Sequence, residues 1–595
     1  MPSKMPNQKS QPAAVTVKQK HRRRRIVAVT GAATLVVGAA AIGVWKFFPH
    51  RSGQLDISSG INLLPQDTLI SAAISTEPER WQKFKELGVP ESRGVLEQQI
   101  AKVQTEFLTN YGYEYQRDIQ PWIGKQILLG YLNNPAATAD KSTKIKLPQQ
   151  QLVVILPIAN LAIAKKTLES DRTPLDANLV ETSYKGVSIK EIKRKAGTIA
   201  IAILDNFAVI GTERQAIQRV IDTQQGSKSL LSIPGYTKAL TEIEIDRPFA
   251  QIYVNIPVAT AVAAANSPQT LSPEKLAQAQ TQQGIAANAT LENEGIAWKG
   301  ISWLKAGTKQ KLVVENKGQN FAEKLPSNTL LMLSGGNFQR LWLDYLSSAA
   351  ANPIAPFKPD DLVKNLDGLT GLELESEILN WSKAPFGLAM IPKPVTADTE
   401  FGAGLVLFQQ ASDRPAADKA FAKLDLTMNK KQSFKVEKAT LGGKDVVNWA
   451  SLGGIAATHG WLDGNLAFLS LGAPVASSFV PQPQKRLADE ALFQQSTRSN
   501  LNAHNGQFYL DVDRTINAGG LPLPYTSPEF IATFKAIRSL GVTSAIFDED
   551  SNRFDLFVAL KKVPGIAKLP PAPVKVIKPA PQPSKSPSPI PKLPN

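Results

Sequence analysis

The sequence contains no cysteine among its 595 residues. Disulfides, thiolate nucleophiles and zinc–thiolate sites are therefore excluded. Histidine is nearly as scarce, with four residues in the chain. The composition, 43% hydrophobic and 20% charged, is that of a folded globular chain. A body of about 500 residues is larger than one core usually supports, so we expect two or more domains.

Acidic residues are absent from both ends of the chain. The formal net charge is +16, but residues 1–53 contain ten Lys or Arg and no acid, and residues 563–595 contain five Lys and no acid. The body between these ends carries 52 basic and 51 acidic residues. Because the body is almost neutral, the net charge does not indicate a nucleic-acid-binding protein.

A hydrophobic stretch near the N-terminus is long enough to cross a bilayer. Residues 26–45 carry no charge, and a helix of about twenty residues spans roughly 30 Å, the thickness of a bilayer core. Eight basic residues precede the stretch, whereas only Lys46 and Arg51 follow it closely. The positive-inside rule therefore predicts a signal anchor at 26–48, after a basic cytoplasmic segment at 1–25. The body is then expected on the periplasmic or lumenal side of the membrane.

A cleaved signal peptide is the alternative interpretation, because Ala39, Ala40 and Ala41 form a small-residue cleavage site. The hydrophobic run continues past these alanines to Trp45, and the polar segment before the run is long for a signal peptide. These features favour an uncleaved anchor. We therefore predict a single-pass membrane protein with a linker at 49–60.

The body contains an internal repeat. Five segments recur in the same order, with offsets between 256 and 261 residues. The recurring pairs are 64–69 with 325–330, 111–122 with 370–381, 206–209 with 465–468, 251–253 with 507–509, and 284–305 with 541–562. Ordered matches at a nearly constant offset indicate duplication rather than coincidence. We predict two copies of one module, at 61–310 and 322–562.

Strand and helix signals alternate in each predicted copy. Residues 151–157 form an apolar run typical of a buried strand, and Asn160 is placed to cap a helix that follows it. In the second copy, 404–408 is the corresponding strand, and Asp413 with Pro415 begins the next helix.

Tight turns join further strands into hairpins. The predicted hairpins are 198–204 with 207–211, 285–291 with 296–304, and 542–547 with 553–560. Sequential strands with short turns and few helices favour antiparallel sheets. The expected fold class is α+β: two tandem copies of an antiparallel-sheet module with helices on one face, preceded by one transmembrane helix.

Two motifs resemble a known family. The opening Leu-Pro-x-x-Thr-Leu, at 64–69 and again at 325–330, and the block at 118–124 are similar to domain of unknown function 3352. The resemblance covers about 55–562, although the second copy departs from the block at 377–383. Members of that family are mainly membrane-anchored envelope proteins of cyanobacteria. The family has no assigned activity, so the resemblance implies architecture and localisation but no catalytic residues.

The histidines form no recognisable site. His21 and His50 flank the predicted span, which leaves His459 and His504 in the body. Neither has a second histidine at metal-ligand spacing, and a single loop histidine is more often solvated or hydrogen-bonded than catalytic. The sequence also lacks a Gly-x-Ser-x-Gly elbow and a phosphate-binding loop.

Two carboxylate pairs recur in the repeat, namely Glu114 with Asp118 and Glu373 with Glu377. Paired carboxylates can perform acid–base chemistry. A spacing of four places them on one face of a helix, whereas the tyrosines at alternate positions from 111 to 115 favour an extended segment. Arg117 offers a plain ion-pair partner, and a pair kept in both copies favours a structural role.

The tryptophans that follow these pairs, Trp122 and Trp381, are expected to be core anchors. The acidic turn at 548–552 could bind a hard cation, but it lacks the glycine and terminal glutamate of an EF-hand, so a solvated turn is favoured. Gly402-Ala403-Gly404 lacks the third glycine of a dinucleotide-binding loop and is read as the start of a strand. We predict no catalytic, cofactor-binding or metal-ligating residues, and no cofactor.

The C-terminal segment 563–595 contains eleven prolines and five lysines. Such a segment cannot bury a core and is expected to be an extended, disordered tail. Two interpretations stay open: a tail that contacts an anionic cell-wall polymer or an acidic protein, and a soluble linker. Nucleic acid is not expected as a partner, because the tail has no aromatic residue for stacking.

These observations favour a non-enzymatic, single-pass envelope protein. Its duplicated extracytoplasmic body is expected to act as a binding or scaffold module, and a hydrophobic ligand held between helices and sheet is the variant of this hypothesis that we consider. The alternative is an extracytoplasmic hydrolase or isomerase that uses carboxylates of an unrecognised site.

Overall fold

A computed structural model describes most of the body of the chain. The described residues are 58–133, 151–170, 176–195, 197–265, 273, 276–277, 280–349, 359–397, 402–452, 454–501, 503–517 and 528–562. The predicted basic segment 1–25, the predicted span 26–48 and the predicted tail 563–595 lie outside them. Within the described part, no helix combines the length and the hydropathy that a membrane crossing requires.

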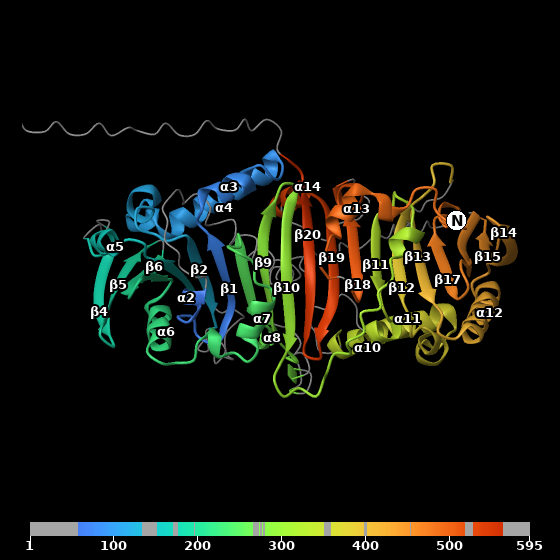
Figure 1. The fold of residues 1–595 in the computed structure, drawn as a ribbon, viewed down its shortest axis with the longest axis horizontal. Helices are drawn as coiled ribbons and strands as arrows, with labels where there is room; N and C mark the ends of the chain where they lie inside the picture. Colours follow the sequence, from blue (N-terminus) through green and yellow to red (C-terminus); the bar gives the residue numbers. More distant parts are fainter. Residues whose placement is uncertain are drawn as a thin grey trace, which may run out of the picture.

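Twenty strands of the described residues form a single sheet, and every pairing in it is antiparallel (Figure 1). Ten strands come from the first half of the body: β1 (Thr68–Ser75), β2 (Gln126–Leu132), β3 (Gln151–Pro157), β4 (Asn178–Tyr184), β5 (Val187–Arg194), β6 (Gly197–Leu204), β7 (Phe207–Gly211), β8 (Ala250–Asn255), β9 (Gln282–Glu292) and β10 (Gly295–Leu304). They pair in the spatial order β4-β5-β6-β7-β3-β2-β1-β8-β9-β10.

The other ten strands come from the second half: β11 (Leu331–Gly335), β12 (Phe386–Pro392), β13 (Ala403–Gln410), β14 (Lys435–Leu441), β15 (Lys444–Ser451), β16 (Gly454–Trp461), β17 (Leu466–Gly472), β18 (Gly506–Asp511), β19 (Ile537–Asp548) and β20 (Ser551–Leu560). They pair in the order β14-β15-β16-β17-β13-β12-β11-β18-β19-β20. Counted from the outer edge inwards, the two halves therefore follow the same order of pairing.

The two halves meet where β10 pairs with β20 in the middle of the sheet. The ladder runs without a register shift from Gly295 opposite Ala559 to Trp303 opposite Ser551. Because the hydrogen bonds continue from one half into the next, the halves share a single sheet (Figure 1).

The ends of the two central hairpins complete this junction in a reciprocal way. The Leu304 N–H donates to the Asp550 carbonyl at 2.8 Å, and the Leu560 N–H donates to the Glu294 carbonyl at 2.9 Å. Side chains add a second contact at each hairpin end: Lys238 of the first half lies 2.7 Å from Asp548. At the other end, Gln495 and Arg498 of the second half contact Glu294 and Glu292.

Helices cover both faces of the sheet. The α-helices are α2 (Ser58–Ile61), α3 (Pro78–Lys85), α4 (Pro90–Phe107), α5 (Leu161–Leu168), α6 (Arg214–Gln224), α7 (Tyr236–Glu242), α8 (Ile256–Ala265), α10 (Phe338–Ala349), α11 (Pro359–Thr370), α12 (Arg414–Lys430), α13 (Ala491–Ser496) and α14 (Pro528–Ala536). Neighbouring residues of β1 belong to different cores, because Ala72 and Ile74 pack with α3, α4 and α5, whereas Ala73 packs with α2, α6 and α7.

The prediction of helices on one face is therefore wrong, while the α+β class with antiparallel strands is confirmed. All eight residues of β1 are buried. A strand buried on both faces reads as a continuous apolar run, which is the pattern that 151–157 also shows. The alternating pattern of a sheet with one solvated face is missing from these strands.

Local sequence signals placed several elements correctly. The Asn160 side chain accepts the Ile163 N–H at 3.1 Å at the start of α5, and the Asp413 side chain accepts the Ala416 N–H at 3.0 Å at the start of α12. Helices α3, α4, α11 and α14, which we did not predict, each begin with a proline. Proline suits the first turn of a helix because the N–H it lacks has no intrahelical partner there.

The body begins earlier than expected. Residues 58–61 form α2, and both Gly60 and Ile61 are buried, although 49–60 was predicted to be a linker. The segment between β10 and β11 is also fixed to the sheet. The Asn316 side chain exchanges two hydrogen bonds of 2.9 Å with the Ile546 backbone, which fixes this segment along β19.

We expect the junction of the halves to be sensitive to glycine substitution. A Cβ at Gly295 would overlap the Val558 carbonyl across the β10–β20 ladder, whereas a Cβ at Gly94 in α4 has no neighbour within 4 Å. Gly295→Ala should lower the free energy of unfolding by about 2 kcal/mol through overpacking. Gly94→Ala should raise it by about 0.5–1 kcal/mol, because glycine is unfavourable inside a helix. Urea denaturation of both variants measures the two changes in the free energy of unfolding, which should have opposite signs. Equal changes in the two variants would contradict the described packing at the junction.

Candidate functional site

The repeated Leu-Pro-x-x-Thr-Leu motif forms the same turn in both halves. In the first half, the Thr68 hydroxyl donates to the Pro65 carbonyl at 2.7 Å, and the Thr68 N–H donates to the same oxygen at 3.0 Å. In the second half, the Thr329 hydroxyl donates to the Pro326 carbonyl at 2.6 Å and its N–H at 3.0 Å. Both threonines are fully buried. Both copies of the motif therefore form the same backbone turn, just before the first strand of their half.

Each of these turns is paired with a distant segment that begins with a lysine. The Gln66 N–H donates to the Lys228 carbonyl at 2.9 Å, and the Ser327 N–H donates to the Lys485 carbonyl at 2.8 Å. Isolated β-bridges, Pro65 with Ser229 and Pro326 with Arg486, extend both contacts. The motif therefore fixes the segment that follows α6 and its counterpart in the second half.

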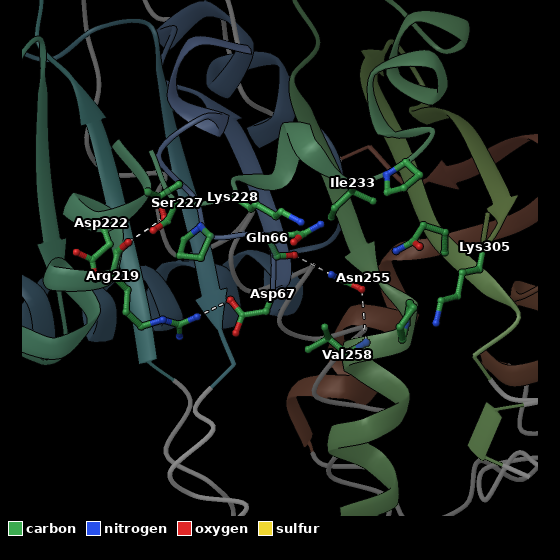
Figure 2. A pocket seen from close by; sticks show the side chains of 15 residues that line it. Gln66, Asp67, Arg219, Asp222, Ser227, Lys228, Ile233, Asn255, Val258 and Lys305 are labelled. Atoms are coloured by element: carbon green, nitrogen blue, oxygen red, sulfur yellow. Dashed lines mark hydrogen bonds and ion pairs between the residues drawn. The ribbon is translucent and has the colours of Figure 1, made fainter. Parts of the chain in front are cut away.

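A pocket of about 520 Å³ lies beside the motif of the first half (Figure 2). Its walls come from the motif turn, from α6 and the segment between α6 and α7, from the end of β8 and the start of α8, from β9, and from the residue after β10. The lining residues are Pro65, Gln66, Asp67, Arg219, Asp222, Thr223, Ser227, Lys228, Ile233, Pro234, Asn255, Pro257, Val258, Gln283 and Lys305. The pocket opens at the edge of the sheet where β1 begins and β10 ends.

The charges around the pocket are only partly balanced. Arg219 forms an ion pair with Asp67, and Asp222 lies 2.5 Å from the Lys185 ammonium. Among the described residues, Lys228 and Lys305 have no carboxylate within 4 Å. These two exposed ammonium groups give the pocket a surplus of positive charge.

Asn255 orders the polar wall of the pocket. Its amide nitrogen donates to the Gln66 carbonyl at 3.1 Å, and its amide oxygen lies 3.5 Å from the Val258 N–H at the start of α8 (Figure 2). Donor groups and cations suit a polar anion better than an apolar ligand. The described residues contain no cluster of His, Asp and Glu that could hold a metal ion.

One repeated sequence pattern points to this site. Lys228-Ser229-Leu230 recurs as Lys485-Arg486-Leu487 at the offset of the repeat. We had not identified Lys228, Lys305 or Asn255 as site residues, because they come together only through the pairing of the motif turn, β8 and β10.

The first carboxylate pair caps a short helical turn. Asp118 is 1% exposed, and its carboxylate accepts the Glu114 N–H at 2.7 Å and the Arg117 guanidinium at 2.8 and 2.9 Å. Glu114 itself is exposed, 3.3 Å from Arg117. The two carboxylates therefore have different roles, and Arg117 is the ion-pair partner that the sequence predicted.

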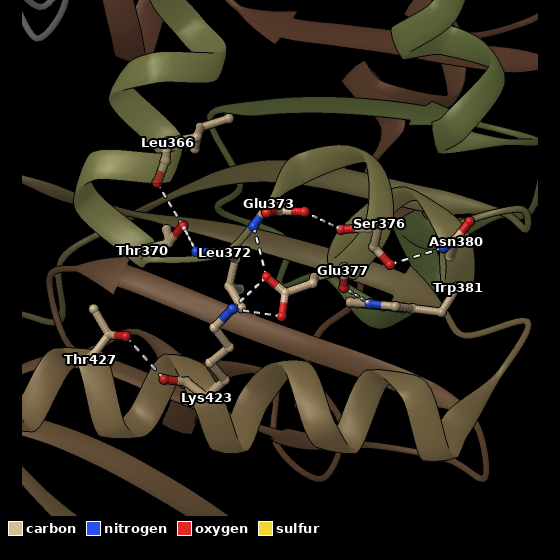
Figure 3. A network of polar contacts seen from close by, with 10 residues as sticks. All are labelled: Leu366, Thr370, Leu372, Glu373, Ser376, Glu377, Asn380, Trp381, Lys423 and Thr427. Atoms are coloured by element: carbon tan, nitrogen blue, oxygen red, sulfur yellow. Dashed lines mark hydrogen bonds and ion pairs between the residues drawn. The ribbon is translucent and has the colours of Figure 1, made fainter.

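The second pair repeats this geometry with a different cation (Figure 3). The Glu377 carboxylate accepts the Glu373 N–H at 2.8 Å and the Lys423 ammonium, from α12, at 2.6 and 2.7 Å. The hydrogen bond from Lys423, followed by the one from the Glu373 N–H, holds the pKa of Glu377 below its ordinary value. The carboxylate is thus ionised and occupied by structural partners.

A tryptophan completes each turn. The Trp122 indole N–H donates to the Asp118 carbonyl at 2.5 Å, and the Trp381 indole N–H donates to the Glu377 carbonyl at 2.8 Å. Both tryptophans are buried, so their prediction as core residues is confirmed. Asp118 and Glu377 lie in π-helical turns, Tyr115–Ile119 and Leu374–Ile378, whereas Glu114 and Glu373 precede these turns with extended backbone. The prediction that the tyrosine spacing continues as an extended segment to Asp118 is therefore wrong.

His459 belongs to a buried cluster between α12 and the sheet. Its Nε2 lies 2.8 Å from the Asp425 carboxylate, which also accepts the Trp449 indole N–H at 2.7 Å. The Phe421 ring stacks on the imidazole with 4.7 Å between centroids. The described partners of His459 are therefore a carboxylate and aromatic rings, an arrangement that ties α12 to β15 and β16.

His504 lies in the loop before β18, where its carbonyl accepts the Gly318 N–H at 2.9 Å. Its Nδ1 is buried and has no hydrogen-bond partner among the described residues. Burial lowers the pKa of this imidazole below its ordinary value. His504 and His459 lie in different contexts and do not form one site.

The acidic turn after β19 is largely exposed, and two of its carboxylates also pair with lysines. Asp548 lies 2.7 Å from Lys238, and Asp550 lies 2.6 Å from Lys311. The Ser551 hydroxyl donates to Asp548 at 2.6 Å. The carboxylates that could have bound a hard cation thus fix the hairpin end to α7 and to the segment after β10.

These features define an α+β protein with one continuous antiparallel sheet, helices on both faces and a polar pocket at a repeated motif. The model of the family described as Protein of unknown function (DUF3352) matches residues 29–560. The chain therefore belongs to this family, as the resemblance of its motifs implied, and the match begins inside the predicted span. Its membrane-anchored and cyanobacterial character stays a prediction.

No curated protein matches the chain. Solved structures with some similarity include crystal form I of TP0453, at 7% identity and a TM-score of 0.22, covering 42% of this chain and 79% of that chain. Crystal form III of TP0453 matches at 10% identity and a TM-score of 0.22, covering 43% and 83%. Similarity at this level carries no argument about fold or function.

We expect the two capping carboxylates to differ in their contribution to stability. Asp118→Ala removes a buried carboxylate and leaves the Glu114 N–H without its acceptor, and should lower the free energy of unfolding by about 3 kcal/mol. Glu377→Ala removes a more exposed cap and should cost about 1 kcal/mol. Glu375→Ala, at an exposed position in the same turn, is the control. Urea denaturation measures all three, and equal costs at 118 and 377 would contradict the structural roles described.

Proposed function

We propose that the protein is a non-enzymatic, single-pass envelope protein whose duplicated extracytoplasmic body is a binding module on a rigid scaffold. The observation that carries the proposal is the pocket at the repeated motif, where Lys228 and Lys305 lack carboxylate partners among the described residues. The ligand that this lining favours is a small anion rather than the hydrophobic molecule that the sequence first led us to consider.

Duplication is supported by the correspondence of the two halves. Both follow the same order of strand pairing. The turns at Thr68 and Thr329 and the caps at Asp118 and Glu377 have the same hydrogen bonds. We infer that 61–310 and 322–562 are tandem copies of one α+β module.

A scaffold role is supported by the central ladder. The unbroken β10–β20 pairing and the reciprocal hairpin contacts hold the halves in one orientation. A large inter-domain motion would have to break this ladder, so binding is expected to occur on a rigid surface.

The envelope location rests on the predicted anchor at 26–48 and on the positive charge before it. The described body ends at Lys562, beside Leu87, at the edge of the sheet where β20 ends. The five lysines of the segment that follows favour contact with a cell-wall polymer or an acidic protein.

The pocket is tested with inorganic phosphate as the probe. Binding to the folded state raises the thermal midpoint, so phosphate should raise the midpoint of the full-length protein relative to chloride at equal ionic strength. Lys228→Glu/Lys305→Glu should abolish the increase, and Lys419→Glu/Lys435→Glu, at exposed lysines outside the pocket, should keep it. An equal increase in all three proteins would contradict an anion site in the pocket.

The tail is tested with isolated cell walls. The full-length protein should co-sediment with them at low salt, and deletion of 563–595 should remove most of the binding. A variant with all five tail lysines replaced by glutamine keeps the prolines and the length of the tail. It therefore shows whether the binding depends on the charge of the tail or on its presence. Unchanged sedimentation of both variants would exclude the tail as the binding segment.

A further inference from the structure

The second half of the body contains a counterpart of the pocket region, and there the charges are balanced differently. The two halves can be compared residue by residue, because equivalent strands have equivalent pairings. Glu292 pairs with Gly295 across the turn of the last hairpin of the first half, and Asp548 pairs with Ser551 across that of the second half. The structure therefore relates the last hairpins by an offset of 256 residues, one fewer than the sequence repeat predicted for this segment.

The pocket residue Lys305 has Lys561 as its counterpart. Each lysine directly follows the last strand of its half, β10 or β20. The Lys305 N–H donates to the Thr281 carbonyl at 2.8 Å, and the Lys561 N–H donates to the Ala536 carbonyl at 2.9 Å. The two acceptors are the residues directly before β9 and β19. The two lysines therefore leave the sheet at equivalent points.

The pocket residue Pro257 has Asp513 as its counterpart. Strand β8 ends at Asn255, and β18 ends at Asp511. The side-chain oxygens of these two residues lie 3.5 and 2.8 Å from the backbone N–H three positions later, so both cap the turn that follows. Pro257 and Asp513 are therefore both the second residue after the strand, and each lies in the turn that its cap begins.

Asp513 supplies an anion to the lysine of the second half. Its carboxylate lies 2.6 Å from the Lys561 ammonium. In the first half the equivalent position is Pro257, which has no charge, and no carboxylate of the described residues lies within 4 Å of the Lys305 ammonium. Both Pro257 and Lys305 line the pocket of about 520 Å³. The first half thus keeps the lysine but lacks the anion that the second half supplies from its own chain.

The other lysine of the pocket does not distinguish the two halves. Lys228 and its counterpart Lys485 both lack a carboxylate within 4 Å in the part of the chain that the structure describes. Both lysines accept an N–H of the motif turn through their backbone carbonyls. Lys305 is therefore the cation whose surroundings have changed between the copies.

The start of α8 adds to the attraction for an anion at this place. The first turn of α8 contains Pro257 and no acidic residue. Negative charge near the first turn of a helix is stabilised by the N–H groups and the dipole of the helix. Val258 of the same turn and Lys305 both line the pocket (Figure 2). An anion held there would meet the lysine and the helix together.

We propose that the anion bound in the pocket takes the place that the Asp513 carboxylate has in the second half, beside Lys305 and the first turn of α8. The ligand is then a small oxyanion, one oxygen of which accepts a hydrogen bond from the Lys305 ammonium. This inference rests on the proposed function. It adds that the first copy of the module binds the anion, whereas the second copy carries its own, and that Pro257 is the residue that determines this difference.

Pro257→Asp tests the inference, because the new carboxylate should pair with Lys305 as Asp513 pairs with Lys561. Inorganic phosphate is the probe, and calorimetric titration of the full-length protein measures its binding. The unmodified protein should bind one phosphate, and Pro257→Asp should weaken this binding by about tenfold or more. Pro257→Asn, which has the size of aspartate without its charge, is the matched control and should keep the affinity. Thermal midpoints in chloride show that each variant is folded.

Asp513→Asn is the reciprocal variant, and it leaves the pocket of the first half unchanged. It removes the anion beside Lys561 and should add a second, weaker phosphate site to the chain. The titration should therefore give two sites in place of one. An unchanged number of sites would show that Asp513 does not stand in for a bound anion, and the inference would be wrong.

The outcomes separate this inference from the proposed function. If the unmodified protein binds no phosphate, the anion pocket and the inference both fail. If it binds phosphate and Pro257→Asp binds equally well, the pocket stands and the inference alone is overturned. A loss in Pro257→Asn as large as in Pro257→Asp would assign the effect to the shape of the turn, which would also overturn the argument from charge.

Discussion

The hydrogen-bonded ladder between β10 and β20 is the contact on which the rest of the structure depends. Each half ends in a hairpin whose last strand would otherwise be an open edge, and an open edge is a site of uncontrolled strand pairing. Pairing the two last strands with each other removes both edges at once. It also places each hairpin end against the opposite half, where Lys238, Gln495 and Arg498 form polar contacts with it. The continuity of the sheet from one half to the other follows from this one pairing.

Much of the local structure could be predicted from short sequence signals. The caps at Asn160 and Asp413, and the hairpins, depend on a few neighbouring residues whose chemistry acts locally. That helices cover both faces of the sheet could not be predicted from such local signals. Strand β1 is buried along its whole length, but its sequence does not tell which helices cover its two faces. The π-helical turns at 115–119 and 374–378 depend on a carboxylate that accepts the backbone N–H four residues earlier, and the tyrosine spacing concealed that contact.

The candidate site illustrates the same limit. The Leu-Pro-x-x-Thr-Leu motif was visible as a repeat, yet its role became clear only when its turn was seen to pair with the segment at Lys228. The pocket joins residues from five separate parts of the chain, so no spacing rule identifies it. The residues that did attract attention, the carboxylate pairs and His459, turned out to satisfy buried backbone and side-chain donors. Polar groups repeated in both halves serve first to fix the chain, because an unpaired buried polar group is costly.

The central ladder has a mechanical consequence. Nine residue pairs join β10 to β20 without a register shift, from Gly295 opposite Ala559 to Trp303 opposite Ser551. The hydrogen bonds of an antiparallel ladder lie across the strand direction. A load that slides one half past the other along the strands is therefore shared by many bonds in shear, and the junction is not opened one bond at a time.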